Sequence, residues 1–478
     1  MEGLISVFFS ICILCLFLIA GKILRAKLKL FQTIFLPASI IGGFIGLTAG
    51  PFVFDIIPET LLISWRQLPG ILINIVFATL FLGVFIPGVR TLWRTGGSQL
   101  CYGMIIGSGQ YFIAMLVTAL LLIPLFNVHP AFGTILEIGF AGGHGTAAGM
   151  EEVFAGIGFP EGAALAYMSA TVGIIVAVVG GIIYINVAIR KGYSRNIDAS
   201  KGIPEFKKSG LIKNESDRQT ISTSTVAGES IEPLAFHFAI VGISVLVGWL
   251  FLNGIGPMHS FFEGKPGIVK VLMFPFAGVK NLHPALEGFP LFPLAMMGGM
   301  VVQLISKVIK VDQYYDKKSF DRILGVSLDF LVVAAISTLR LDLFFENLWP
   351  FLILMVFGVA WIYICLVFLA PRMLPVNWFE KGITEYGMQT GVTAVGLLLL
   401  RLVDPEYKTD TAQAFGFKQM LYEPFFGGGF LTATAPFIIV SLGAWGSIFS
   451  AGGIMILFFL LSWANGWVRF KPDRRVIA

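Results

Sequence analysis

Apolar segments about as long as a bilayer is thick recur along almost the whole chain. A helix that crosses a membrane needs roughly 20 mostly apolar residues. Only 13% of the 478 residues are charged, whereas a soluble protein carries roughly 25%. The basic residues lie in the loops between the segments rather than on one face, so the net charge of +5 does not indicate a nucleic-acid partner. The sequence therefore predicts an all-α integral membrane protein whose main partner is the lipid membrane.

About eleven of these segments are expected to be transmembrane helices. Five precede a polar stretch, five follow it, and one more lies near the C-terminus: 4–21, 34–53, 70–89, 99–126 and 162–188, then 235–256, 286–305, 323–341, 347–370 and 424–442, and finally 446–466. This order predicts a first five-helix repeat at 1–189, a flexible cytoplasmic linker at 190–234, a second repeat at 235–442, and an additional C-terminal helix with a basic tail at 443–478.

Two polar, glycine-rich stretches interrupt the apolar pattern. Phe140–Gly149 contains four glycines, a histidine and a threonine, and Glu385–Ala394 is a similar stretch in the other half. Broken backbone at membrane depth is tolerated only where protein buries it or where it lines a cavity. We therefore expect re-entrant hairpins at 131–156 and 377–401. Interrupted segments in corresponding halves indicate the binding site of a secondary transporter.

The distribution of lysine and arginine predicts the orientation, because these residues accumulate in cytoplasmic loops. With the N-terminus outside the cell membrane, the linker and the C-terminus are cytoplasmic. The predicted outer loops then hold only five of the 33 basic residues, namely Arg66, Lys265, Lys270, Lys280 and Arg340.

Matching patterns in the two halves indicate an internal repeat. Five spans in each half are an odd number, so the second half must enter the membrane from the opposite side, with its hairpin inverted. The pairs are Pro37-x4-Gly42-Gly43 and Pro293-x4-Gly298-Gly299, Gly70-x3-Asn74 and Gly325-x3-Asp329, and Gly142 before Pro160-Glu161 with Gly387 before Pro405-Glu406.

Gly142-Gly143-His144-Gly145-Thr146 resembles the signature of bacterial sodium:glutamate symporters. Leu36-Pro37 leading into Gly42-Gly43 is also similar to that family, and the resemblance covers about residues 4–442. The second hairpin departs from the family, which usually has Gly-Ala-Thr-Pro-Thr where this chain has Gly391-Val-Thr-Ala-Val395. The resemblance implies two inverted five-helix halves, sodium coupling, a homodimer, and glutamate or a related amino acid or carboxylate as the substrate.

The hairpin tips are the expected substrate site. Free N–H groups of half-helices favour a carboxylate, and hydroxyl and carbonyl oxygens suit sodium. The alternative for Thr146 is local capping of the broken helix, and for His144 a hydrogen bond to a neighbouring helix. The expected substrate-binding residues are Gly143, His144, Gly145, Thr146, Gln389, Thr390, Gly391 and Thr393.

Acidic and amide side chains near the bilayer centre are candidates for a sodium site. A charge there costs on the order of 3 kcal/mol or more, so Asp329 should face an ion-binding interior. Asn74 is its repeat mate, and Glu385 lies deep in the second hairpin. The alternative for Asp329 is a structural pair with a residue such as Lys418 or Arg401.

Other classes of function fit the sequence less well. It contains no Gly-x4-Gly-Lys-Ser/Thr phosphate loop, which argues against an ATP-driven pump. Two unlike hairpins in one chain argue against a passive channel. Neither a nucleophile nor metal-ligand spacing accompanies His144, so we expect no enzyme and no cofactor, with Na⁺ only as the coupling ion. A proton-coupled carrier that uses Asp329 or Glu385 remains the alternative.

Overall fold

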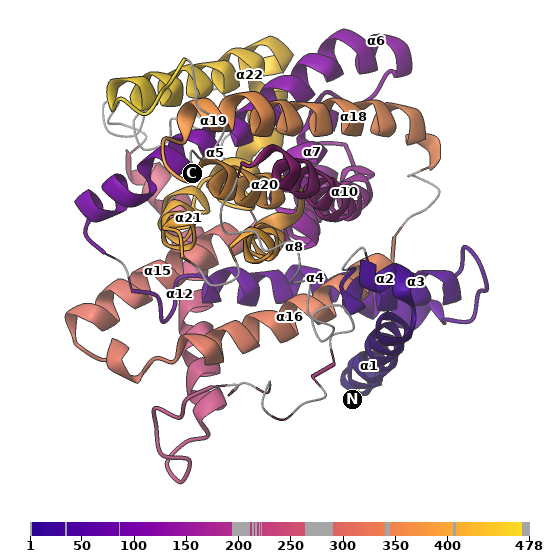
Figure 1. Ribbon diagram of the computed structural model, residues 1–478. Coiled ribbons are helices and arrows are strands. Elements are labelled where there is room, and N and C mark those ends of the chain that lie inside the picture. Colours follow the sequence, from indigo (N-terminus) through magenta and orange to yellow (C-terminus); the bar gives the residue numbers. More distant parts are fainter. Residues whose placement is uncertain are drawn as a thin grey trace. The chain divides into compact units, whose positions relative to one another are not determined.

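The computed structural model describes residues 2–33, 36–85, 87–193, 222–262, 290–339, 345–404 and 408–470, with a few positions between 211 and 220. Within these ranges all regular structure is helical (Figure 1), which confirms the all-α prediction. Nine helices of the described ranges are long and apolar enough to cross a membrane. Most of the predicted linker, Pro405-Glu406, and the outer-loop residues Lys265, Lys270, Lys280 and Arg340 lie outside the described residues.

The chain divides into two compact units, each of which draws on both halves of the sequence. The first comprises Met1–Ile86, Ala148–Gly156 and Glu205–Leu341, and the second comprises Pro87–Ala147, Ile157–Pro204 and Asp342–Ala478.

The first unit is a row of helices in which each one packs against the next. The order is α1 (Glu2–Lys27), α3 (Ala38–Ala49), α16 (Lys317–Ser337), α4 (Glu59–Thr79), α15 (Leu291–Val308) and α12 (Pro233–Phe262). Helices from the first half therefore alternate with helices from the second half in the middle of the row. The short helices α2 (Lys29–Thr33) and α9 (Glu151–Gly156) and the turn η5 (Asp312–Tyr314) complete this unit.

Paired glycines explain why this row is tightly packed, since small residues let helix backbones approach closely. A Cβ added at Gly42 would lie 2.6 Å from the Phe17 carbonyl oxygen on α1, and one at Gly43 would lie 2.6 Å from Ile336 on α16. Gly298 similarly faces α12 and Gly299 faces Ala78 on α4. Each double glycine therefore packs its helix against a long helix of its own half and against a helix of the other half.

The second unit contains the two interrupted segments. Its long helices are α5 (Val89–Val117), α10 (Gly162–Lys191), α18 (Leu348–Ile364), α20 (Trp378–Val403), α21 (Thr411–Tyr422) and α22 (Phe430–Ala464). Helix α5 packs against α22, α21 and α18, and α10 packs against α20. Shorter elements are η1 (Thr118–Leu122), α6 (Ile123–Phe126), η2 (Pro130–Thr134), α7 (Ile135–Phe140), α8 (Gly143–Gly149, up to Ala147), η6 (Cys365–Leu369) and α19 (Ala370–Met373).

The same local irregularity occurs once in each half of this unit. Helix α5 runs into the π-helical turn η1, which is followed by Pro124, and α18 runs into the π-helical turn η6, which is followed by Pro371. Proline has no N–H to donate to the preceding turn, and a π turn accommodates such a local defect.

Several predicted spans differ from the observed helices. The span 34–53 is only α3, because Pro37 precedes its first turn and the chain leaves the helix at Gly50. The third span, 70–89, begins earlier, since α4 starts at Glu59 and tolerates Pro69 in its interior. The predicted helices 424–442 and 446–466 form α22, which is interrupted at Gly443.

Candidate functional site

Helix α20 is broken where the second hairpin is expected. Gly391 and Val392 have non-helical backbone angles, and Val392 has a φ of 67°. A Cβ added at Gly387, before the break, would lie 2.9 Å from the Gly396 Cα, after it. Residues so far apart along a straight helix would not touch, so the two halves of α20 fold back on each other.

A second break separates α7 from α8. The chain leaves α7 at Phe140 and re-enters a helix at Gly143, whose φ is +74°. A side chain is strained at this angle, so glycine suits the position. A Cβ on Gly143 would clash with Val392 Cγ1. The two breaks therefore meet, and their free backbone groups lie at one place within the second unit.

The hydroxyl groups next to the breaks are used locally. Thr146 Oγ1 donates to the Gly142 carbonyl at 2.9 Å, and Thr390 Oγ1 donates to the Tyr386 carbonyl at 2.6 Å. The Thr146 contact is local to the broken segment, as the capping alternative is, but it is a bond to the carbonyl four residues earlier and not a cap. Such back-bonding is typical of threonine at a bent or broken helix.

His144 is buried and its ring contacts the neighbouring helix α10. Its Nε2 lies 3.0 Å from Thr171 Oγ1, and that hydroxyl donates to the Tyr167 carbonyl at 3.2 Å. Because the hydroxyl proton is used there, Nε2 is assigned as the donor to Thr171. Gly145, the next residue in α8, is buried as well.

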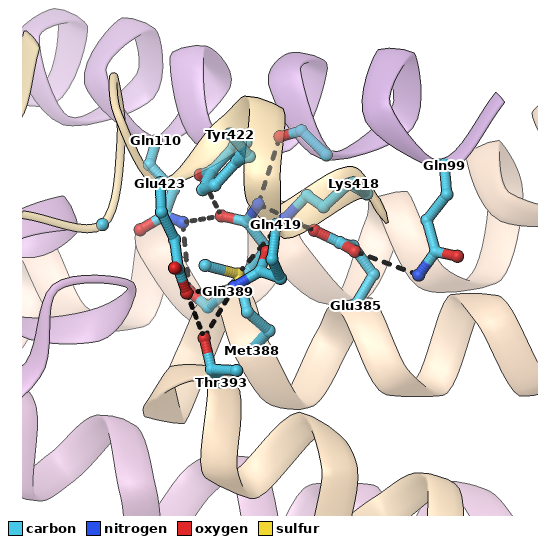
Figure 2. A network of polar contacts seen from close by, with 12 residues as sticks. Gln99, Gln110, Glu385, Met388, Gln389, Thr393, Lys418, Gln419, Tyr422 and Glu423 are labelled. Atoms are coloured by element: carbon cyan, nitrogen blue, oxygen red, sulfur yellow. Dashed lines mark hydrogen bonds and ion pairs between the residues drawn. The ribbon is translucent and has the colours of Figure 1, made fainter. Parts of the chain in front are cut away.

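A buried ion pair supports the first half of α20. Glu385 Oε1 and Lys418 Nζ are 2.6 Å apart, and both side chains are fully buried (Figure 2). Gln99 on α5 donates to the other carboxylate oxygen at 3.4 Å. Lys418, considered as a partner for Asp329, thus pairs with Glu385 instead.

Gln389 uses every hydrogen-bonding position of its side chain within the protein. Its Nε2 donates to Glu385 Oε1 and to the Gly103 carbonyl, each at 3.1 Å. Its Oε1 accepts from Gln110 Nε2 at 3.0 Å and from Tyr422 at 3.1 Å. Gln110 also donates to the Gln389 backbone carbonyl at 3.0 Å, which the break in α20 has freed from a helical partner.

Thr393 follows the break and faces α21. Gln419 Nε2 donates to Thr393 Oγ1 at 2.6 Å and to Glu423 Oε1 at 2.8 Å, and Thr393 donates to the same carboxylate oxygen at 3.1 Å (Figure 2). On α21, Lys418 therefore pairs with the first half of α20, and the next residue, Gln419, bonds to the second half.

Glu137 on α7 is a buried acid that our sequence analysis missed. Tyr111 donates to its Oε2 at 2.6 Å, and the Gly427 N–H and Thr432 hydroxyl donate to its Oε1 at 2.8 and 3.1 Å. The sequence could have indicated Glu137 through the spacing Glu137-x-Gly139-x3-Gly143, which recurs around Glu385 as Glu385-x-Gly387-x3-Gly391. This spacing also pairs Gly387 with Gly139, three residues earlier than the Gly142 chosen from the sequence.

The candidate ion residues Asn74 and Asp329 belong to the first unit, whereas Glu385 belongs to the second. Asn74 Nδ2 donates to the Gly70 carbonyl at 2.7 Å. Its Oδ1 is buried without a hydrogen-bond partner among the described residues. Asp329 is exposed on α16, which packs against the helix of Asn74, and the Ser39 side chain on α3 hydrogen-bonds its carboxylate.

Comparison with known proteins supports the resemblance noted from the sequence. A family model described as sodium/glutamate symporter matches residues 4–255. No curated protein and no solved structure matches the chain.

Proposed function

Because the chain belongs to the sodium/glutamate symporter family, we propose that it accumulates glutamate, or a closely related amino acid or carboxylate, by sodium-coupled alternating access. The substrate site lies where the break between α7 and α8 meets the break in α20. It is formed by the backbone groups freed at the two breaks, in the stretches that hold Gly143, His144, Gly145, Thr146, Gln389, Thr390, Gly391 and Thr393, the last four from α20.

The observation that carries this proposal is the contact between Gly143 and Val392. Each break frees N–H and C=O groups that a continuous helix would use internally. Half-helix N-termini stabilise a carboxylate, and freed carbonyls coordinate a monovalent cation. Two breaks at one point supply both kinds of group together, as symport of an anion with a cation requires.

Oxygen atoms beside the α20 break support a sodium site there. Gln110 is fully buried, and its Oε1 has no hydrogen-bond partner among the described residues. The same side chain contacts the freed carbonyl of Gln389. An unpaired buried oxygen is costly unless a partner such as water or an ion satisfies it.

A second ion site in the first unit would use Asn74 and Asp329. The buried Oδ1 of Asn74 lacks a described partner, and Asp329 would supply a negative charge from the adjacent helix α16. An acid on a membrane-spanning helix is expensive, and the Ser39 hydroxyl that bonds Asp329 carries no compensating charge.

The repeated pattern of broken segments supports alternating access. The two halves contribute a π turn with a following proline, then a buried glutamate and a break, in the same order. An inverted repeat of this kind lets one site open to either side of the membrane. We also propose the homodimer implied by the family resemblance, in the cell membrane, with the N-terminus outside and the linker and C-terminus in the cytoplasm.

Proton coupling is a second candidate because of Glu137. Its carboxylate is fully buried and receives hydrogen bonds only from uncharged groups among the described residues. A buried acid without a cationic partner is a possible site of proton uptake.

Uptake of labelled glutamate into proteoliposomes distinguishes the two candidates. We expect accumulation under an inward sodium gradient and none under a proton gradient alone. Accumulation under the proton gradient without sodium would replace sodium coupling by proton coupling. Failure under both gradients, with folded protein, would overturn glutamate as the substrate, and other amino acids and carboxylates would then be tested.

A further inference from the structure

The two broken segments carry equivalent acids in different surroundings. Glu137 precedes Gly143 by the same number of residues as Glu385 precedes Gly391. Both side chains are fully buried. Glu137 is bound by a phenol, a hydroxyl and a backbone N–H, whereas Glu385 is bound by two amides and an ammonium group. The fold therefore holds one acid at this position without a lysine.

The Lys418 ammonium has the surroundings of a bound monovalent cation. Besides Glu385 Oε1 at 2.6 Å, it contacts Gln419 Oε1 at 2.7 Å and Met388 Sδ at 3.5 Å (Figure 2). These three acceptors match its three N–H donors. The ammonium also lies 3.5 Å from the centre of the Tyr422 ring, an attractive position for a cation.

Space for the lysine depends on a glycine of α5. A Cβ added at Gly103 would lie 2.5 Å from Lys418 Cε and 2.7 Å from Glu385 Oε1. The Gly103 carbonyl also accepts a hydrogen bond from Gln389. Helices α5, α20 and α21 thus all contact the Lys418 side chain.

We propose that Lys418 is a tethered cation that fills a monovalent-cation site at Glu385. Glu385 then holds no transported sodium, and the lysine sets how many sodium ions the carrier requires. This inference rests on the proposed sodium-coupled symport and replaces the earlier assignment of Glu385 as a sodium ligand.

The chemistry of the site shows what removal of the lysine would create. Lys418→Ala leaves the Glu385 carboxylate, Gln419 Oε1 and Met388 Sδ around the vacated volume. An unpaired buried carboxylate is strongly destabilising, and a small cation with oxygen ligands relieves that cost.

The test is thermal unfolding of the purified full-length protein in sodium chloride or choline chloride, without glutamate. Lys418→Ala should gain a saturable sodium-dependent rise in Tm beyond that of the wild type, because a ligand that binds only the folded state stabilises it. The double variant Lys418→Ala/Glu385→Gln should lose this additional rise. In proteoliposomes, glutamate uptake by Lys418→Ala should depend more steeply on sodium concentration than wild-type uptake.

Lys381→Ala is the matched control, since Lys381 is a buried lysine of α20 paired with Asp410 at 2.8 Å. Asp410 is partly exposed, so water can replace the lysine and no additional sodium effect is expected. A folded Lys418→Ala protein with the wild-type sodium response would show that Lys418 is only structural. The thermal measurement requires no transport, so it stands even if the glutamate assignment fails.

Glu385→Gln provides a second test should Lys418→Ala not fold in either salt. The sodium-dependent rise in Tm should equal that of the wild type, because Glu385 binds no sodium. A diminished rise in this variant would place a transported ion at Glu385 and overturn the proposal.

Discussion

At the scale of single residues, the sequence drew attention to polar side chains that are buried in the structure, but it did not predict their partners. Apolar surroundings made His144, Gln389 and Glu385 conspicuous, since polar groups there need a function or a partner. Lys418 was considered only for Asp329, because no local pattern states which helix faces which. Glu137 was missed because it lies before the glycine-rich stretch Phe140–Gly149 and not within it.

Gly143→Ala tests the meeting of the two breaks. The new Cβ would contact Val392 and impose a side chain on a residue at φ +74°, with a strain of about 1–3 kcal/mol. We expect a loss of glutamate uptake of about tenfold or more with normal membrane insertion. Gly416→Ala on α21 is the control, as nothing lies within 4 Å of its added Cβ. Equal uptake by both variants would contradict the proposed site.

His129, which lies before the first broken segment, should make the stability of the folded protein depend on pH in the acid range. Its Nδ1 accepts the Ala131 N–H at 3.1 Å, and its ring stacks on Phe159 with centroids 4.9 Å apart. Burial lowers its pKa from the usual 6.5, although the Ile157 backbone and Glu161 act in the opposite direction.

The depressed pKa means that the unfolded chain takes up the proton first. Stability is therefore full above the ordinary histidine pKa and falls as the pH is lowered towards the folded-state value. The Tm of the wild type should fall across this range more than that of His129→Asn, which retains a capping acceptor but does not titrate there. Parallel Tm curves would show that His129 does not contribute.

At the scale of helices, hydrophobic segments predicted where most elements lie, and polar glycine-rich stretches predicted where they break. Their ends were harder to predict, because apolar residues continue through turns that a membrane also buries. The span 34–53 is an example, since Phe52 and Val53 are apolar but lie beyond Gly50, where α3 has ended. The fold-back of α20 could be anticipated from Gly387, Gly391 and Gly396, whose small size permits the close approach.

Gln419→Ala tests whether α21 holds the second half of α20. The change removes the hydrogen bonds to Thr393 and Glu423 and the acceptor of the Lys418 ammonium, each bond being worth about 1 kcal/mol or somewhat more with a charged partner. We expect weaker sodium-driven uptake and a lower Tm. Gln413→Ala on the exposed face of the same helix should change neither. Unchanged uptake and Tm in Gln419→Ala would show that these hydrogen bonds do not hold the second half of α20.

Asp316 is the N-cap of α16 and ties it to the residues that precede α12. Its Oδ2 accepts from the Ser319 N–H at 2.9 Å, the Ser319 hydroxyl at 2.8 Å and the Thr223 N–H at 3.2 Å. Burial alone would raise the pKa of Asp316, but these hydrogen bonds and nearby His237 hold it below the usual 3.8. Its stabilising contribution is therefore present above that value and is lost as the pH falls through the lower folded-state pKa.

Asp316→Ala should lower the free energy of unfolding by about 1 kcal/mol, the usual cost of a lost N-cap. Asp321→Ala, on the same helix, removes only an exposed ion pair with Lys317 and should cost less. Denaturant titration of both purified variants measures the difference. Equal effects of the two substitutions would rule out the capping role.

At the scale of the whole molecule, the sequence predicted two related halves but not two units that mix them. The double glycines of α3 and α15 were visible as a repeat, yet the contact of Gly43 with Ile336 joins opposite halves. Contacts of this kind depend on side-chain fit between distant segments, which hydrophobic periodicity does not encode. Nor did the sequence predict that Asp329 would be exposed on α16.

Asp329→Asn tests the contribution of the first unit to ion coupling. The substitution keeps the size of the side chain and removes its charge, so sodium activation of uptake should be abolished or shifted to much higher concentration. Membrane insertion should remain normal. Asp321→Asn on the same helix is the control and should retain the wild-type curve. Unchanged sodium activation in Asp329→Asn would exclude this acid from the ion site.

The ion pair of Glu385 and Lys418 has an electrical consequence for the transport cycle. A charge that crosses the membrane potential gains or loses about 2.3 kcal/mol per 100 mV. The two opposite charges are 2.6 Å apart and any motion of α20 with α21 carries them together. The resting potential therefore does almost no work on this pair, and it neither helps nor hinders the return of the empty carrier at this position.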